Sequence, residues 1–180
     1  MMRRLLRSPL VWSMTALLVA GAAFGLYLFQ PWKLWVDVRV QEELPQVVEP
    51  RWEDPTTTPP GPILLAEGEF VSQEHATSGA AQLIEQPDGS VVLSIADLDT
   101  SNGPDLRVWL TDQSVDPDDW FVFDDGYHVE LGTLKGNLGD QVYEVPADVD
   151  LDRVGSVSVW CARFSVSFGA AALEPVPPTD

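Results

Sequence analysis

The chain has 180 residues, of which 28 are Asp or Glu and 10 are Lys or Arg, and its formal net charge is −18. Most of this charge lies in residues 41–180, which carry 27 acidic and five basic side chains. Such an acidic body repels phosphate backbones, so nucleic acid is excluded as a partner. The single cysteine, Cys161, excludes an internal disulfide and any site built from several cysteines.

Residues 10–29 contain no charged side chain and are mostly apolar. Twenty residues in a helix span about 30 Å, the hydrocarbon thickness of a bilayer. Arg3, Arg4 and Arg7 precede this segment, whereas only Lys33 and Arg39 follow it closely. The positive-inside rule then predicts a single-pass protein of the cell membrane with a cytoplasmic N-terminus and an extracytoplasmic C-terminal domain. Residues 1–36 are predicted to form a cytoplasmic stub and a transmembrane signal anchor.

A cleaved signal peptide is the alternative interpretation of this segment, with Ala20-Gly21-Ala22 as the cleavage site. The apolar run continues to Phe29, which is longer than a usual signal-peptide core, and this length favours the anchor. Both interpretations place the body of the chain outside the cytoplasm.

Residues 37–62 are rich in proline and acidic side chains, which predicts an extended linker that lifts the following domain off the membrane. A tail over residues 175–180, with three prolines, is predicted to be disordered. Residues 63–174 remain as one globular domain.

Within this domain, short apolar runs alternate with turn residues, which is typical of an all-β fold. The predicted architecture is a single antiparallel β-sandwich or barrel of about seven to nine strands. Pro87-Asp88-Gly89 predicts a hairpin turn between two of these strands. The clearest strands are expected at 80–85, 90–95, 106–110, 127–131, 142–145 and 156–161, with a last one at 164–168.

The alternation of apolar residues changes phase after Cys161. Val157, Val159 and Cys161 share one face of their strand and have odd numbers. The apolar residues that share a face of the next strand have even numbers: Phe164, Val166 and Phe168. A bulge or tight bend is therefore expected there. Cys161 should lie near a strand end and face inward, and Trp160 should face the opposite side.

Several short motifs in order along the chain resemble the electron-transfer DM-thirteen (DM13) domain family. The similarity runs from Gly68 to Leu173 and identifies the chain as resembling a membrane-anchored, bacterial-type member. It rests on Gly68-Glu69-Phe70, His75, Ser78-Gly79, Asn102-Gly103-Pro104-Asp105-Leu106, Leu131-Gly132-Thr133-Leu134-Lys135-Gly136-Asn137, Gly139-Asp140-Gln141-Val142-Tyr143, Val159-Trp160-Cys161, Phe164 and Phe168-Gly169-Ala170-Ala171. The resemblance implies an extracellular β domain whose redox role centres on Cys161.

Under this interpretation the protein is a membrane-tethered electron-transfer or thiol-redox module. A thiol can be oxidised, can exchange disulfides or can ligate haem iron. Because no second cysteine exists, a redox cycle needs a redox partner protein, a small thiol or a bound cofactor. His75, Lys135, Asp105 and Trp160 are the candidate supporting residues around Cys161. The alternative is that Cys161 packs as a small buried hydrophobic residue.

Asp97, Asp99 and Asp105, with Asn102 between them, supply oxygen ligands at short intervals, as calcium loops do, although their spacing departs from the EF-hand pattern. They support a second hypothesis, a noncatalytic extracellular module that binds a protein, a glycan or calcium.

His128 alternates out of phase with the neighbouring apolar residues and is expected to be exposed. The sequence contains no nucleophile elbow and no His-Glu-x-x-His motif, so a conventional hydrolase is not predicted.

Overall fold

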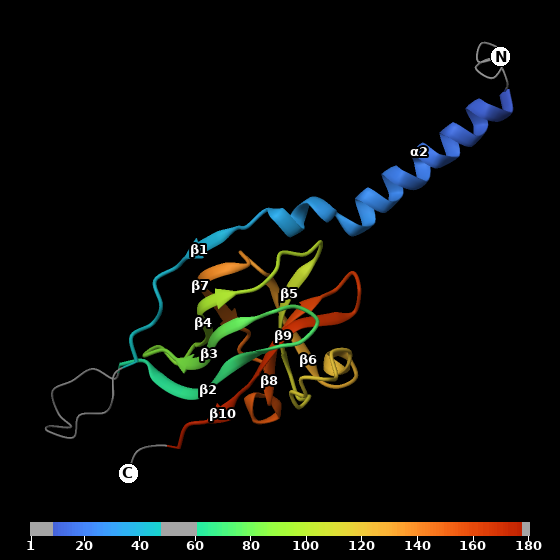
Figure 1. The fold of residues 1–180 in the computed structure, drawn as a ribbon. Coiled ribbons are helices and arrows are strands. Elements are labelled where there is room, and N and C mark those ends of the chain that lie inside the picture. Colours follow the sequence, from blue (N-terminus) through green and yellow to red (C-terminus); the bar gives the residue numbers. More distant parts are fainter. Residues whose placement is uncertain (1–8, 48–60, 178–180) are drawn as a thin grey trace, which may run out of the picture.

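The computed structural model describes residues 9–47 and 61–177. One long helix, α2 (Pro9–Phe29), and a short 3-10 helix, η1 (Pro31–Trp35), precede a domain made mainly of strands, as Figure 1 shows. The strands are β1 (Arg39–Gln41), β2 (Ile63–Ser72), β3 (Ser78–Glu85), β4 (Val91–Asp99), β5 (Leu106–Thr111), β6 (His128–Thr133), β7 (Leu138–Val145), β8 (Ser156–Cys161), β9 (Val166–Ala172) and β10 (Glu174–Pro175). The predicted all-β domain preceded by one apolar helix is confirmed.

The strands of the described residues form one sheet in the order β1-β7-β4-β3-β2-β9-β8-β5-β6, and β10 pairs with β2. Strand β2 joins the two halves, because its residues 63–69 pair with β3 whereas residues 70–72 pair with β9. The sheet therefore curls into a half-barrel. Its pairs are antiparallel, as predicted, except that β1 runs parallel to β7.

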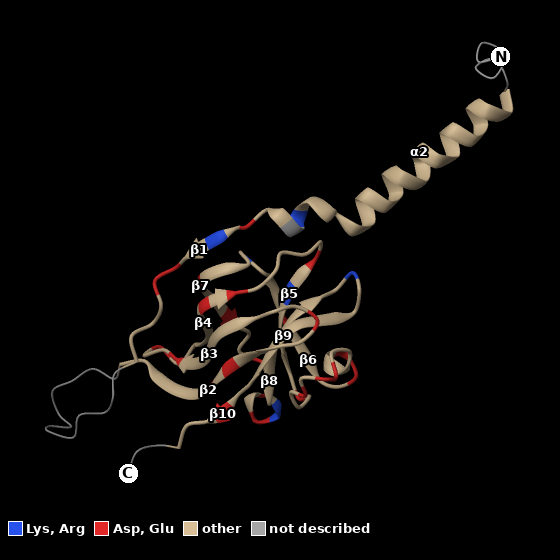
Figure 2. Cartoon of the chain, viewed as in Figure 1, with Lys and Arg blue, Asp and Glu red and all other residues tan. Residues whose placement is uncertain are grey.

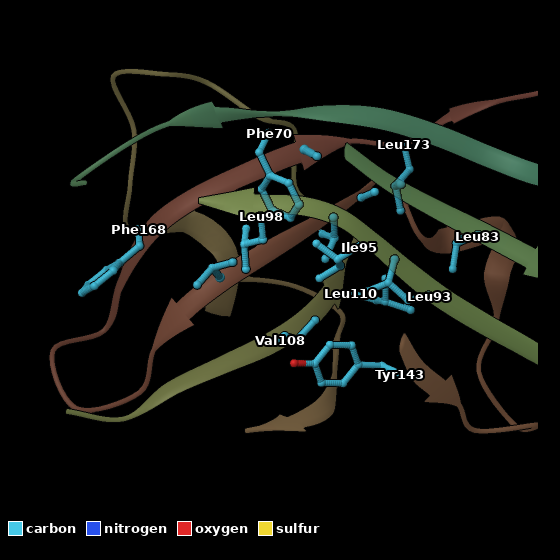
Figure 3. Packing of buried hydrophobic residues seen from close by; sticks show 14 of the residues in the cluster. Phe70, Leu83, Leu93, Ile95, Leu98, Val108, Leu110, Tyr143, Phe168 and Leu173 are labelled. Atoms are coloured by element: carbon cyan, nitrogen blue, oxygen red, sulfur yellow. The ribbon is translucent and has the colours of Figure 1, made fainter. Parts of the chain in front are cut away.

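The main core fills the space inside this half-barrel. Figure 3 shows its side chains converging from both halves of the sheet, among them Phe70, Ile95, Leu110 and Tyr143. A smaller cluster of Trp109, Phe123, Trp160 and Ala170 lies on the other side of β5, β8 and β9. Every residue of β8 is buried, because one face of the strand meets the main core and the other meets the smaller cluster.

Local turn chemistry explains two hairpins. The β3–β4 hairpin turns at the predicted Pro87-Asp88-Gly89, where the Asp88 carboxylate accepts the backbone N–H of Ser90 at 2.9 Å. The β8–β9 hairpin turns at residues 162–165, and its pairing shifts by one residue between Val159 and Trp160. The tight bend predicted after Cys161 is this turn, whereas the register shift lies before Cys161, and Phe164 lies in the turn and not in the last strand.

The segment that follows α2 is docked on the domain, and we name residues 31–42 the strap. Its strand β1 pairs with β7, and the Asn137 side chain accepts the Val38 backbone N–H at 2.8 Å. Gly136 and Gly139 permit this contact, because a Cβ at either position would collide with the strap backbone. The first part of residues 37–62 is therefore docked on the domain, and the role of the segment as a spacer above the membrane stays a prediction.

Some predictions fall on residues outside the described ranges. Residues 48–60 hold Pro50, Pro55, Pro59 and Pro60 of the predicted linker, and residues 1–8 hold the three N-terminal arginines. At the other end, Glu174–Pro175 forms β10, and the Val176 N–H donates to the Leu65 carbonyl at 2.9 Å. The ordered chain therefore extends past Glu174, into the beginning of the predicted tail.

The strap should detach when Gly139 is replaced by Ala. Gly139 has a φ of +96° and Gly89 one of +83°, so Ala costs about 1–3 kcal/mol of backbone strain at both. Only at Gly139 does the new Cβ also meet Val40, whereas nothing lies within 4 Å at Gly89. In full-length protein in detergent, Gly139→Ala should lower the free energy of unfolding more than Gly89→Ala. It should also speed tryptic cleavage after Arg39 in β1. Equal effects of the two variants would contradict this packing of the strap.

Candidate functional site

Cys161 is the last residue of β8 and is 0% exposed. Leu106 in β5 and Val166 in β9 are its cross-strand partners, and its side chain belongs to the main core. Trp160 belongs to the smaller cluster on the other face, so the two neighbours point to opposite sides of the sheet, as strand geometry requires.

The environment of Cys161 keeps its thiol protonated. Burial is the largest influence and raises the pKa of the thiol above its ordinary value. The backbone amides of Phe164, Arg163 and Asp105 oppose this shift, because amide N–H groups favour the thiolate. A neutral, sealed thiol is a poor nucleophile, so the geometry disfavours disulfide exchange with a partner thiol.

The Lys135 side chain is directed to the strap. Its ammonium donates to both carboxylate oxygens of Glu42 at 2.7 and 2.9 Å and lies 4.9 Å from the centre of the Tyr143 ring. The same hydrogen bonds lower the pKa of Glu42. Lys135 therefore fastens the strap to the domain, and its charge is engaged there.

Asp105 is joined to Cys161 through the backbone, since its carbonyl accepts the Ala162 N–H at 2.9 Å. Its carboxylate accepts from Arg107 Nε at 2.8 Å, and Arg107 also pairs with Glu130. These hydrogen bonds raise the pKa of Arg107, with the bond to Asp105 as the largest cause.

His75 lies in the loop between β2 and β3, and its backbone N–H donates to the Phe168 carbonyl in β9 at 3.3 Å. Its Nε2 is 2.5 Å from a carboxylate oxygen of Glu74, and its ring packs on Phe168 with the ring centres 3.9 Å apart. The imidazole is partly exposed and belongs to the wall of a cleft.

This cleft, which we name the interfacial cleft, has a volume of about 280 Å³. It lies where the end of α2 meets the domain. Its walls are residues 29–31 and Lys33 from the chain after the helix, Glu74 and His75, residues 102–104, and Phe164, Val166 and Phe168. Cys161 does not line it, but Val166 is the cross-strand partner of Cys161 and forms part of the wall.

A second cleft of about 320 Å³ lies beside it, beneath the strap. The segments 102–106 and 133–137 meet there with strap residues such as Trp32 and Val36. Both segments belong to the motifs on which the family resemblance rests. They meet around the strap, and only the first reaches Cys161, through Asp105 and Leu106.

The calcium candidates do not converge. The Asp105 carboxylate pairs with Arg107, and Asp97 lies at an irregular point of β4, where its N–H donates to Asp140. Asn102 donates to the Val36 carbonyl in the strap at 2.9 Å. Within the residues that the structure describes, no group of three His, Cys, Asp or Glu side chains is placed to hold a metal ion.

A haem ligated by Cys161 does not fit this arrangement. The sulfur is fully buried, and Cys161 lines neither of the two clefts described above. A macrocycle at this position would have to replace Leu106 and Val166, which are themselves buried.

A stack of aromatic rings crosses the outer face of β8, β5 and β6. The Trp160 and Trp109 rings are 5.1 Å apart at 25°, and the Trp109 and His128 rings are 4.4 Å apart at 9°. Trp160 is 1% exposed, whereas His128 is exposed as predicted. Trp109 is not among the site residues predicted from the sequence. The signal was a second tryptophan at an outward position, between the inward-facing Val108 and Leu110.

The family model described as "Electron transfer DM13" matches residues 69–173. This chain belongs to the DM13 family. Comparison with curated proteins and with solved structures gave no significant match. The matched residues run from the end of β2 to the residue after β9 and include Trp109, His128, Trp160 and Cys161.

The residues matched by the family model include neither α2 nor the strap, which contains β1. Residues inside the matched range nevertheless contact both. Arg163, in the β8–β9 turn, donates to the carbonyls of Tyr27 and Leu28 at 3.0 and 3.2 Å. These belong to the last turn of α2, whose carbonyls lack partners within the helix, and a cation is favoured there. The turn that follows Cys161 therefore caps the apolar helix.

The thiol should make stability fall in alkaline solution. Because the folded-state pKa of Cys161 is raised above the unfolded value, the contribution of the neutral thiol is complete below pH 9 and is lost above it. Between the unfolded and folded pKa values, the free energy of unfolding should fall by up to about 1.4 kcal/mol per pH unit relative to Cys161→Ala. Urea unfolding at pH 7 to 10 measures this difference. Parallel curves for the two proteins would mean that the thiol is not sealed.

Proposed function

We propose that this protein is a membrane-tethered DM13 domain that carries electrons at the extracytoplasmic surface of the cell membrane. The observation that carries the proposal is the ring stack from the buried Trp160, which adjoins Cys161 in the chain, through Trp109 to the exposed His128. It offers a route between β8 and the surface of a domain whose family is described as electron transfer.

The helix supports the tethering. Helix α2 has 21 residues and no buried one, and its length suits a bilayer. Figure 2 shows α2 without charged residues, whereas Asp and Glu are spread over the loops and strands of the domain. Trp32 and Trp35 follow the helix, at the level where such rings favour the headgroups. If the N-terminus is cytoplasmic, the domain lies at the extracytoplasmic surface of the membrane.

The burial of Cys161 favours electron transfer over thiol exchange. Exchange needs a thiolate that a partner sulfur can reach, and the Cys161 thiol is neutral and sealed. Electron transfer between side chains does not need direct contact between two sulfur atoms. We assign the one-electron step to Trp160, because an indole can lose an electron and keep its N–H proton, whereas the neutral Cys161 thiol would also have to release its proton.

The surface end of the stack has a proton acceptor. The Trp109 indole N–H donates to Glu130 at 3.4 Å. When a redox partner protein takes one electron from Trp109, the indole becomes a radical cation, and its N–H proton can pass to the Glu130 carboxylate. An electron from Trp160 then reduces Trp109 while the proton returns from Glu130 to the indole nitrogen, and the Trp160 radical cation left behind is reduced by a second redox partner.

The orientation is tested by reporter fusions. A periplasm-active reporter fused after Asp180 should give signal, and a reporter that works only in the cytoplasm should give none. The intact mass of the membrane-bound protein should retain the N-terminal segment. A mature protein that begins near Ala23 would instead establish a cleaved signal peptide, and signal from the cytoplasmic reporter would contradict the orientation.

The electron route is tested by a ruthenium polypyridyl label on His128→Cys, since the native thiol is sealed against labelling. After flash oxidation of the label, its re-reduction should be severalfold slower when Trp109→Phe is added. Trp120→Phe serves as the matched control, because the Trp120 indole bonds to Pro117 and takes no part in the stack. Equal rates in both variants would contradict the route.

A further inference from the structure

The interfacial cleft lies at the level of the bilayer surface if α2 spans the membrane. Its first wall is formed by Phe29, the last residue of α2, with Gln30 and Pro31 directly after it. Figure 1 shows α2 projecting away from the sheet, so that this corner of the domain is the part next to the helix end. A ligand could therefore hold one end in the cleft and another in the hydrocarbon.

The walls of the cleft suit a flat ring. Phe29 and Phe164 stack with their ring centres 5.5 Å apart at 24°, and His75 packs on Phe168 at 3.9 Å. Aromatic walls favour planar, apolar ligands through stacking and edge contacts. A volume of about 280 Å³ is close to the lower limit for small-molecule sites and suits a single ring.

The polar groups of the cleft suit a neutral ligand with oxygen atoms. One ammonium, Lys33, and one carboxylate, Glu74, contribute opposite charges, so the walls do not select an anionic headgroup. Lys33 donates one N–H to the Gly103 carbonyl at 2.8 Å and has two more for a ligand oxygen. The imidazole of His75, held by Glu74, can exchange a proton with a hydroxyl or carbonyl group.

We infer that the interfacial cleft binds the ring of a lipid-soluble quinone or quinol, whose tail lies in the bilayer. This inference rests on the proposed function, since it names the membrane-dissolved carrier that an electron-transfer domain at this position would meet. Lys33 and His75 contact the ring oxygens, and Phe164 and Phe168 contact its faces. Val166 separates the ring from Cys161, because it belongs to the cleft wall and pairs with Cys161 across β8 and β9.

Binding is tested with the full-length protein in phosphatidylcholine nanodiscs. A photoreactive azidobenzoquinone with a decyl tail is the probe, and mass spectrometry of the peptides locates the label. We expect labelling within residues 29–33, 74–75 or 164–168, and competition by unlabelled decylbenzoquinone. Decylbenzene, which has the same tail and ring without the oxygens, should compete at least tenfold more weakly. Equal competition would overturn the inference, because the cleft would then be only an apolar hollow.

Three variants separate ring recognition from docking of the strap. Lys33→Met and His75→Gln should each weaken the binding of decylbenzoquinone about tenfold. Lys135→Met removes a lysine that holds the far end of the strap at Glu42, outside this cleft, and it should weaken the binding several times less than either of the other two substitutions. An equal loss in Lys135→Met, or no loss in the other two, would overturn the inference.

These results are distinguishable from a failure of the proposed function. The reporter fusions and the flash experiment contain no quinone. Correct orientation and an intact electron route without quinone labelling would overturn this inference alone. A domain found on the cytoplasmic side would overturn the proposed function, whatever the probe does.

Discussion

The docking of the chain directly after α2 decides how the whole molecule is arranged. Arg163 caps the last turn of the helix, and the strap then pairs with the edge of β7. Both contacts use residues inside the DM13 domain, so the helix and the domain form one connected unit. The domain consequently presents one fixed corner, with the interfacial cleft and the β8–β9 turn, to the end of the helix.

Burial on both faces sets the chemistry of β8. A strand with one face in water would let a cysteine at its end ionise and react. Here the main core covers Cys161 and the smaller cluster covers Trp160, which raises the pKa of the thiol and removes its access to solvent. The same packing brings Trp160 against Trp109, and so the loss of thiol reactivity and the ring stack have one structural cause.

Local patterns were sufficient for much of the fold. Alternating apolar residues located β8 with its observed bounds, and the Pro87-Asp88-Gly89 turn located the β3–β4 hairpin. The phase change after Cys161 indicated the tight turn at residues 162–165, between β8 and β9. The pairing of the strap with β7 was not predicted, because a strand of only three residues at a sheet edge forms through its partner strand and has no clear pattern of its own. The glycines that make room for it lie about a hundred residues away.

The sequence by itself determined the apolar helix, the all-β class and the family, because each depends on composition, on short-range periodicity or on motifs in order. It also fixed the opposite directions of Trp160 and Cys161, which follow from strand geometry. Tertiary structure alone decided that Lys135 binds Glu42, that His75 lines a cleft and that Trp109 stacks between Trp160 and His128. The reason is that these contacts join strands far apart in the chain, and their partners are set by the curl of the sheet.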